Sequence, residues 1–246
     1  TNTNTETKSG YISVSGGSAI TSTTSGGNWT DEETWVGGVV PTENDNVIID
    51  GNVNVNSNKS CQNLTVNRGK IIQNGGYYYD LTVNGNLINN GTIRNNPDGY
   101  DFEMNIAGNI VNNGSVTLES LTLFSSNDQT ITMGTTANFT NINLFNEIDG
   151  NEMIAGSDLT FTDCYITSNK DGVDGEIVLP AYSGFGLVFS GSSITNTMIS
   201  ANNNSVTSNN DHYYSSNITI SDAILKGTIM AGSNSFILAG NTVLEG

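Results

Sequence analysis

Two segments of this chain repeat one another, and this repeat restricts the possible folds more than any other sequence feature. Residues 81–93 read LTVNGNLINNGTI, and residues 104–116 read MNIAGNIVNNGSV. Most of the positions that differ between the two segments exchange one aliphatic residue for another. Imperfect periods near 20 residues are typical of solenoids. The identical positions are all glycine or asparagine: Gly85/Gly108, Asn86/Asn109, Asn89/Asn112, Asn90/Asn113 and Gly91/Gly114.

Short apolar runs with the same character follow one another from residue 47 onward. The runs at 47–49, 64–66 and 81–83 begin 17 residues apart in each step. Many of them alternate apolar and polar residues, which is typical of strands with one buried face. The 28 glycines and the many asparagines suit tight corners between strands, because both residues adopt positive φ at little cost. Asn, Ser, Thr and Gly also disfavour helix interiors, so we expect a nearly all-β protein.

The repeat favours a parallel coil over an antiparallel sandwich. An Asn-Gly corner by itself would suggest a hairpin, but the block restarts the same strand–corner–strand order one period later. Equivalent residues would then stack about 4.8 Å apart, with aliphatic residues inside and asparagines hydrogen-bonded along the corners. We therefore predict an all-β fold, a single right-handed parallel β-helix with an N-terminal cap and about nine turns. A β-sandwich or jelly roll is the alternative.

The chain divides into three parts on composition. Residues 1–27 are rich in Ser, Thr and Gly and read as a flexible leader or a cap strand. Residues 28–46 contain both tryptophans, Trp29 and Trp35, and are expected to cap the open end of the core. Residues 47–246 are expected to form the parallel β-helix and, because they end on a further strand and corner, to continue beyond this fragment. Cys61 and Cys164 lie too far apart for contact in a coil whose turns touch only their neighbours.

The opening of the chain resembles a known family. The segments NW at 28–29, TWVGGVVP at 34–41 and DNVII at 45–49, followed by the block at 81–93, are similar to secreted Bacteroidetes-type parallel β-helix surface proteins. The eight-conserved-glycine domain of extracellular proteins is a more distant likeness. The resemblance covers roughly residues 28–150. It implies export, commonly as cargo of the type IX secretion machinery, and location at the outer cell surface or outside the cell. Members include adhesins and polysaccharide-active enzymes, so the resemblance selects no single activity.

Charge and hydropathy exclude several partners. The formal net charge is −17, which would repel phosphate backbones, so nucleic acid is not expected as a partner. No run of 18 apolar residues is present, so no membrane span is expected. The surplus of carboxylates is compatible with Ca²⁺, the one candidate ion, although no cofactor is otherwise indicated.

Three groups of residues are candidates for binding. The first is aromatic and suits sugar stacking: Tyr77, Tyr78, Tyr79, Tyr213 and Tyr214. The second is cationic and falls on early turns, where its members could share a face and neutralise an acidic glycan: Arg68, Lys70 and Arg94. The third is an acidic loop around glycines that could wrap Ca²⁺: Asp171, Asp174 and Glu176.

No set of residues in the sequence identifies an active site. The single histidine, His212, lies in a polar stretch and reads as a surface residue rather than part of a catalytic set. We therefore expect a non-enzymatic secreted or cell-surface module for adhesion or glycan contact, within a larger exported protein. The alternative is a polysaccharide lyase or hydrolase acting on an extracellular glycan.

Overall fold

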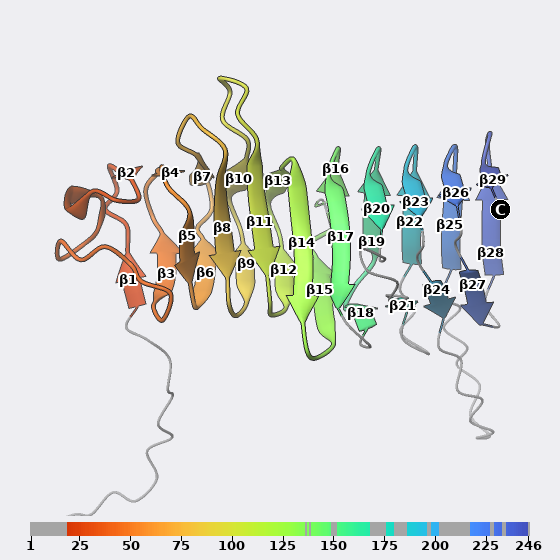
Figure 1. Ribbon diagram of the computed structural model, residues 1–246. Coiled ribbons are helices and arrows are strands. Elements are labelled where there is room, and N and C mark those ends of the chain that lie inside the picture. Colours follow the sequence, from red (N-terminus) through yellow and green to blue (C-terminus); the bar gives the residue numbers. More distant parts are fainter. Residues whose placement is uncertain are drawn as a thin grey trace, which may run out of the picture.

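The computed structural model is a rod of stacked β-strands (Figure 1). It describes residues 19–135, 137, 139–148, 152–167, 176–179, 186–195, 198–201, 217–226, 229–232 and 235–245. The strands of this part form three sheets of ten, ten and nine strands, and one 3₁₀ helix, η1 (Glu32–Thr34), interrupts them. Because sequential strands fall in different sheets, the chain visits the three sheets in turn and winds as a coil.

Each sheet collects one strand from each successive turn of the coil. Sheet 1 contains β1 (Ala19–Thr21), β3 (Asn46–Ile49), β6 (Asn63–Val66), β9 (Leu87–Asn89), β12 (Ile110–Asn112), β15 (Gln129–Met133), β18 (Glu152–Ala155), β21 (Glu176–Leu179), β24 (Met198–Ala201) and β27 (Ile229–Gly232). Sheet 2 contains β2 (Gly27–Asn28), β4 (Val53–Val55), β7 (Ile71–Asn74), β10 (Thr92–Arg94), β13 (Ser115–Thr117), β16 (Phe139–Thr140), β19 (Leu159–Thr162), β22 (Gly186–Ser190), β25 (Asn217–Ser221) and β28 (Ser235–Ala239). Sheet 3 contains β5 (Lys59–Cys61), β8 (Tyr79–Val83), β11 (Phe102–Ile106), β14 (Ser120–Ser125), β17 (Asn143–Ile148), β20 (Tyr165–Thr167), β23 (Ser193–Thr195), β26 (Ile224–Lys226) and β29 (Val243–Glu245).

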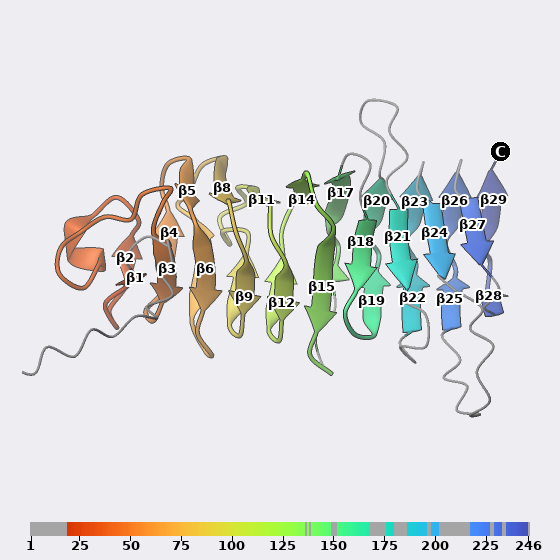
Figure 2. The same ribbon diagram turned by 90° about the horizontal axis from the view of Figure 1, so that it is seen from below.

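The predicted parallel β-helix is confirmed by the pairing of these strands. Each strand of sheet 1 lies beside the strand one turn later and points the same way, as Figure 2 shows. The two repeated blocks stack directly on one another, with Leu81 beside Met104 and Leu87 beside Ile110. Thr92 likewise lies beside Ser115. A shift of 23 residues therefore places every strand of one block on its equivalent, which is why the glycines and asparagines between them recur.

The core is a column of inward-facing side chains along the rod. Alternation within the strands decides which residues enter it, since successive side chains point to opposite faces. In β6, for example, Leu64 and Val66 are fully buried while Asn63 and Thr65 are only partly buried. The column includes a stack of three phenylalanines, Phe139, Phe161 and Phe189, from successive turns.

The predicted asparagine contacts between turns are present at the corners. The Asn63 side-chain amide donates to Asn46 Oδ1 at 2.6 Å, and that of Asn113 donates to Asn90 Oδ1 at 2.9 Å. Each bond joins equivalent positions on neighbouring turns. The asparagines thus satisfy polar groups at bends where the backbone leaves the sheet ladders.

Other asparagines lie inside the rod, which was not expected. Asn89 and Asn112 are fully buried, and Asn89 Nδ2 donates to Asn112 Oδ1 at 2.8 Å. Their side-chain oxygens accept bonds from the backbone N–H groups of Gly91 and Gly114, two residues further on. Each buried asparagine therefore holds the glycine corner that follows its own strand.

The two tryptophans pack together near the beginning of the described chain. Trp29 and Trp35 are buried, with ring centroids 5.1 Å apart in an edge-on arrangement. Trp35 Nε1 donates to the Trp29 carbonyl oxygen at 2.7 Å. Both rings belong to the buried core of the rod, and Figure 1 places η1 at the β1 end of the stack. That residues 28–46 act as a cap stays a prediction.

Both cysteines are free and buried, which agrees with the expectation that they would not meet. The part of the chain that the structure describes has no helix with the length and apolar character that crossing a membrane requires.

Burial of Cys61 has a consequence at high pH. Desolvation raises the pKa of its thiol from the ordinary 9.0 to about 12. The native state therefore keeps the neutral thiol where the unfolded chain already carries a thiolate. The contribution of the neutral Cys61 thiol to the free energy of unfolding is therefore fully present below pH 9 and is lost as the pH rises through 12.

We expect this loss to be measurable as a difference between two proteins. Between pH 9 and 11, the unfolding free energy of the wild type should fall by about 1.4 kcal/mol per pH unit more than that of Cys61→Ala. Urea denaturation at pH 8, 9, 10 and 11 measures both slopes, and other titrating groups cancel in the difference. Parallel slopes would show that the thiol ionises without unfolding.

Candidate functional site

Two long turns rise from the rod at neighbouring positions (Figure 1). One joins β7 to β8 across residues 75–78, and the other joins β10 to β11 across residues 95–101. Their sequences explain why the strands stop there. Gly76 and Gly99 have φ values of 94° and 90°, a left-handed backbone region that residues with a Cβ rarely adopt. Pro97, in the second turn, has no N–H to donate to a ladder hydrogen bond, so it does not favour a strand there.

Four tyrosines meet where these turns lie side by side. The Tyr77 ring has its centroid 5.7 Å from Tyr78, 5.8 Å from Tyr79 and 5.9 Å from Tyr100. The Tyr78 and Tyr100 rings are 5.8 Å apart and nearly perpendicular. These spacings are within the range of favourable aromatic pairs. We call these four residues the tyrosine cluster.

The cluster has a partly buried base and an exposed surface. Tyr79, the first residue of β8, packs against the core because it lies on the same strand face as the buried Leu81 and Val83. Tyr77 and Tyr78 leave 58% and 60% of their surfaces exposed to solvent. Aromatic rings held by other rings yet open to solvent offer preformed apolar ring faces, each with a hydroxyl at its edge.

Asn74 connects the two turns from below. Its side chain is fully buried at the end of β7, and its Nδ2 donates to the Tyr77 carbonyl at 2.8 Å and to the Asp101 carbonyl at 3.2 Å. Its Oδ1 accepts the backbone N–H of Asn96 at 2.5 Å. One buried amide therefore fixes the Tyr77 turn to the Tyr100 turn. Such fully satisfied buried polar groups are costly to disrupt.

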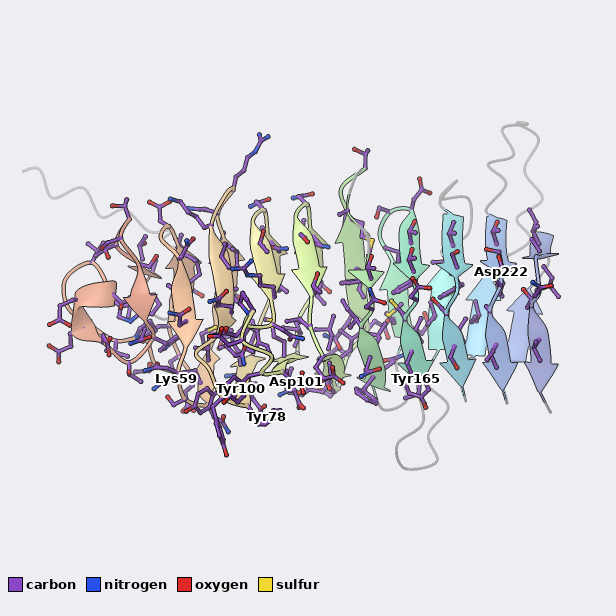
Figure 3. All side chains as sticks on the ribbon, turned by 90° about the horizontal axis from the view of Figure 1, so that it is seen from above. Lys59, Tyr78, Tyr100, Asp101, Tyr165 and Asp222 are labelled. Atoms are coloured by element: carbon purple, nitrogen blue, oxygen red, sulfur yellow. The ribbon has the colours of Figure 1, made fainter. Side chains whose placement is uncertain are left out.

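Charged and polar groups border the cluster. In Figure 3, Lys59 and Asp101 lie along the same edge of the rod as Tyr78 and Tyr100, whereas Tyr165 lies further along it. Tyr165 is 40% exposed on β20. Aromatic faces bordered by charged and amide groups suit a ligand with apolar faces and hydroxylated edges.

The three predicted cations do not stack on one another. Arg68 is exposed in the turn before β7, and Lys70 ends that turn. Arg94 ends β10, where its register partner is Gln73 rather than Lys70. Arg94 is therefore displaced from Lys70 by three residues along the strand direction. Of the three, Arg94 is nearest in sequence to the tyrosine cluster, directly before the turn that carries Tyr100.

Several predicted residues fall outside the described residues. These are Tyr213, Tyr214, Asp171 and Asp174; Glu176 begins β21, but its side chain is not described. Within the described ranges, no group of three or more His, Cys, Asp or Glu side chains could hold a metal ion.

Tyr100 and Asn74 were missing from the sequence-based candidates. Tyr100 lies 23 residues after Tyr77, the same interval that separates the two repeated blocks, so the period itself could have paired them. Asn74 carries no comparable signal, because an asparagine at the end of a strand usually reads as an exposed corner.

Comparisons of this chain with protein-family models, curated proteins and solved structures found no match.

Proposed function

We propose that this chain is a non-catalytic contact module of an exported protein, which binds an extracellular glycan through the tyrosine cluster. The observation that carries the proposal is the exposure of Tyr77 and Tyr78, 58% and 60%, within a group of four touching rings. Two adjacent exposed rings place a large apolar area in water, and such area commonly marks a binding site. Glycan contact at a cell surface would serve adhesion.

A sugar ring suits this surface chemically. One face of many pyranoses presents C–H groups that stack on an aromatic ring, while their hydroxyls need hydrogen-bonding partners at the edge. The cluster offers tyrosine hydroxyls, with Asp98 and Asp101 on the turn that carries Tyr100. Asn74 holds both turns before a ligand arrives, so little ordering entropy remains to be lost on binding.

Export to the outer cell surface, through the type IX machinery, is part of the proposal. It is supported by the resemblance of residues 28–150 to secreted β-helix surface proteins. A rod that presents its binding turns on one side is suited to holding a ligand away from its point of attachment.

The proposal predicts that binding depends on the exposed rings. In a glycan array followed by titration of the best ligand, the double substitution Tyr77→Ala/Tyr78→Ala should weaken binding about 100-fold, roughly tenfold for each ring. Both side chains are largely exposed, so the melting temperature should change little. The matched control is Tyr165→Ala, which removes an exposed tyrosine of sheet 3 that lies outside the cluster and should leave affinity unchanged.

Two outcomes would contradict the proposal. The first is wild-type protein that binds no glycan on a broad array, or binds equally well after both rings are removed. The second is release of shortened or unsaturated oligosaccharides from a bound polysaccharide. That result would favour the alternative, a polysaccharide lyase or hydrolase.

A further inference from the structure

Sheet 2 differs from the rest of the molecule in charge. The chain carries 24 acidic residues, yet none of the described strand residues of sheet 2 is acidic. Sheet 1 carries Glu152 and Glu176, and sheet 3 carries both acidic and basic residues. Arg94 is the one charged residue within the described strands of sheet 2. Among the three sheets, sheet 2 is therefore the one whose described strand residues repel a negatively charged ligand least.

Arg94 is held in place by a row of amides across three turns. Its Nε donates to Gln73 Oε1 at 2.9 Å, and Gln73 Nε2 donates in turn to Asn54 Oδ1 at 3.0 Å. The next turn places Thr117 on the other side of Arg94. This row fixes the guanidinium against the sheet, and no carboxylate from the described part of the chain pairs with it.

The fixed guanidinium borders a small depression. The hollow has a volume of about 60 Å³ and is lined by Asn52, Val53, Asn54, Ile71, Gln73 and Arg94. All of its lining side chains except Arg94 are neutral. Nε is engaged by Gln73, and neither terminal nitrogen of the guanidinium is hydrogen-bonded to an acceptor in the part of the chain that the structure describes, so both can donate to a ligand. Two parallel N–H groups match the two oxygens of a carboxylate or sulfate.

Two residues that line the depression lie close to the tyrosine cluster along the chain. Gln73 directly precedes Asn74, the residue that holds both tyrosine turns, and Arg94 directly precedes the second turn. Tyr77 follows Gln73 by four residue steps, which span at most about 14 Å. Since Arg94 lies one strand spacing from Gln73, about 4.8 Å, a short oligosaccharide can reach from the guanidinium to the rings.

We propose that Arg94 binds the anionic group of an acidic glycan, a carboxylate or a sulfate, while a neighbouring sugar ring lies on the tyrosine cluster. This inference rests on the proposed glycan binding and adds the class of ligand. The local cation makes an acidic glycan acceptable to a protein whose net charge is −17. Asp98 and Asp101 lie on the cluster side, so the charged group of the ligand is directed toward Arg94.

A pair of probes that differ only in charge tests the proposal. Oligogalacturonate and its methyl ester share their sugar rings, and only the first carries free carboxylates. A panel of sulfated and desulfated oligosaccharides of equal length tests the other anion. We expect the wild-type chain to bind at least one acidic probe about 10- to 100-fold more tightly than its neutralised form.

Substitutions at Arg94 should remove this difference and nothing else. Arg94→Gln should weaken binding of the acidic probe to the level of the neutral one and leave the neutral probe unchanged. Arg94→Lys should give an intermediate affinity, because a lysine keeps the charge but loses the two-pronged geometry. Arg68→Gln is the matched control, since it removes an exposed cation from a neighbouring turn and should change neither affinity.

The possible failures are distinguishable. If acidic and neutral probes bind the wild type equally, and Arg94→Gln changes neither, the role of Arg94 is overturned while glycan binding stands. If no probe of either kind binds and the tyrosine substitutions have no effect on any array ligand, both proposals are overturned. If Arg94→Gln lowers the affinity for both probes equally, Arg94 maintains the shape of the site and does not bind the anion. That result would also overturn the proposal.

Discussion

Replacing Phe161 by alanine is expected to destabilise the rod by about 3–5 kcal/mol, enough to unfold at least its central turns. Phe161 lies between two other rings, with centroids 5.6 Å from Phe139 and 5.2 Å from Phe189. All three side chains are buried. Truncation would leave a cavity in the middle of the stack and remove two aromatic contacts together, and the neighbouring turns cannot collapse into it without breaking their ladders.

Chemical denaturation followed by far-UV circular dichroism measures this effect. Phe145→Ala is the matched control, because Phe145 points outward from β17 between Thr122 and Thr167 and is only partly buried. Its loss should cost about 1 kcal/mol or less. Equal destabilisation by the two substitutions would mean that the central phenylalanines do not form the core of this region.

Replacing Gly114 by alanine should be comparably damaging, although it adds only one carbon atom. A Cβ at this position would lie 2.1 Å from the carbonyl oxygen of Gly91 on the preceding turn, a backbone atom that cannot move aside. Relief requires the two turns to separate, which strains the pairing on both sides of the corner. We expect a loss of about 3 kcal/mol and a lower melting temperature.

The control for this substitution is Gly69→Ala. Gly69 has a φ of 74°, so alanine pays the cost of a left-handed backbone, about 1–2 kcal/mol, but its Cβ meets nothing within 4 Å. Gly114 does not adopt positive φ, so its larger predicted effect comes from crowding between turns alone. A Gly114→Ala protein as stable as the wild type would show that neighbouring turns are less closely stacked than described here.

The candidate site was only partly predictable from the sequence. The triplet at residues 77–79 stands out in the sequence, but only the structure shows that Tyr77 and Tyr78 lie in a turn while Tyr79 begins β8 and packs against the core. Arg94 was singled out as a cation, but its separation from Lys70 depends on strand register. Asn74 could not be found, since its role comes from two backbone carbonyls that lie 3 and 27 residues away in the sequence.

The sequence alone determined that this chain is all-β and that its turns stack in parallel. Strand alternation and glycine corners are local properties that act over fewer residues than one turn of the rod, and the repeated block recurs after one turn. The tertiary structure decided which side chains meet between turns. Phe139, Phe161 and Phe189 are separated by 22 and 28 residues, so no constant period relates them. The connections between strands vary in length without disturbing the hydrogen-bonded ladders. The backbone hydrogen bonds between strands, and not the separation in the sequence, therefore determine which residues meet along the rod.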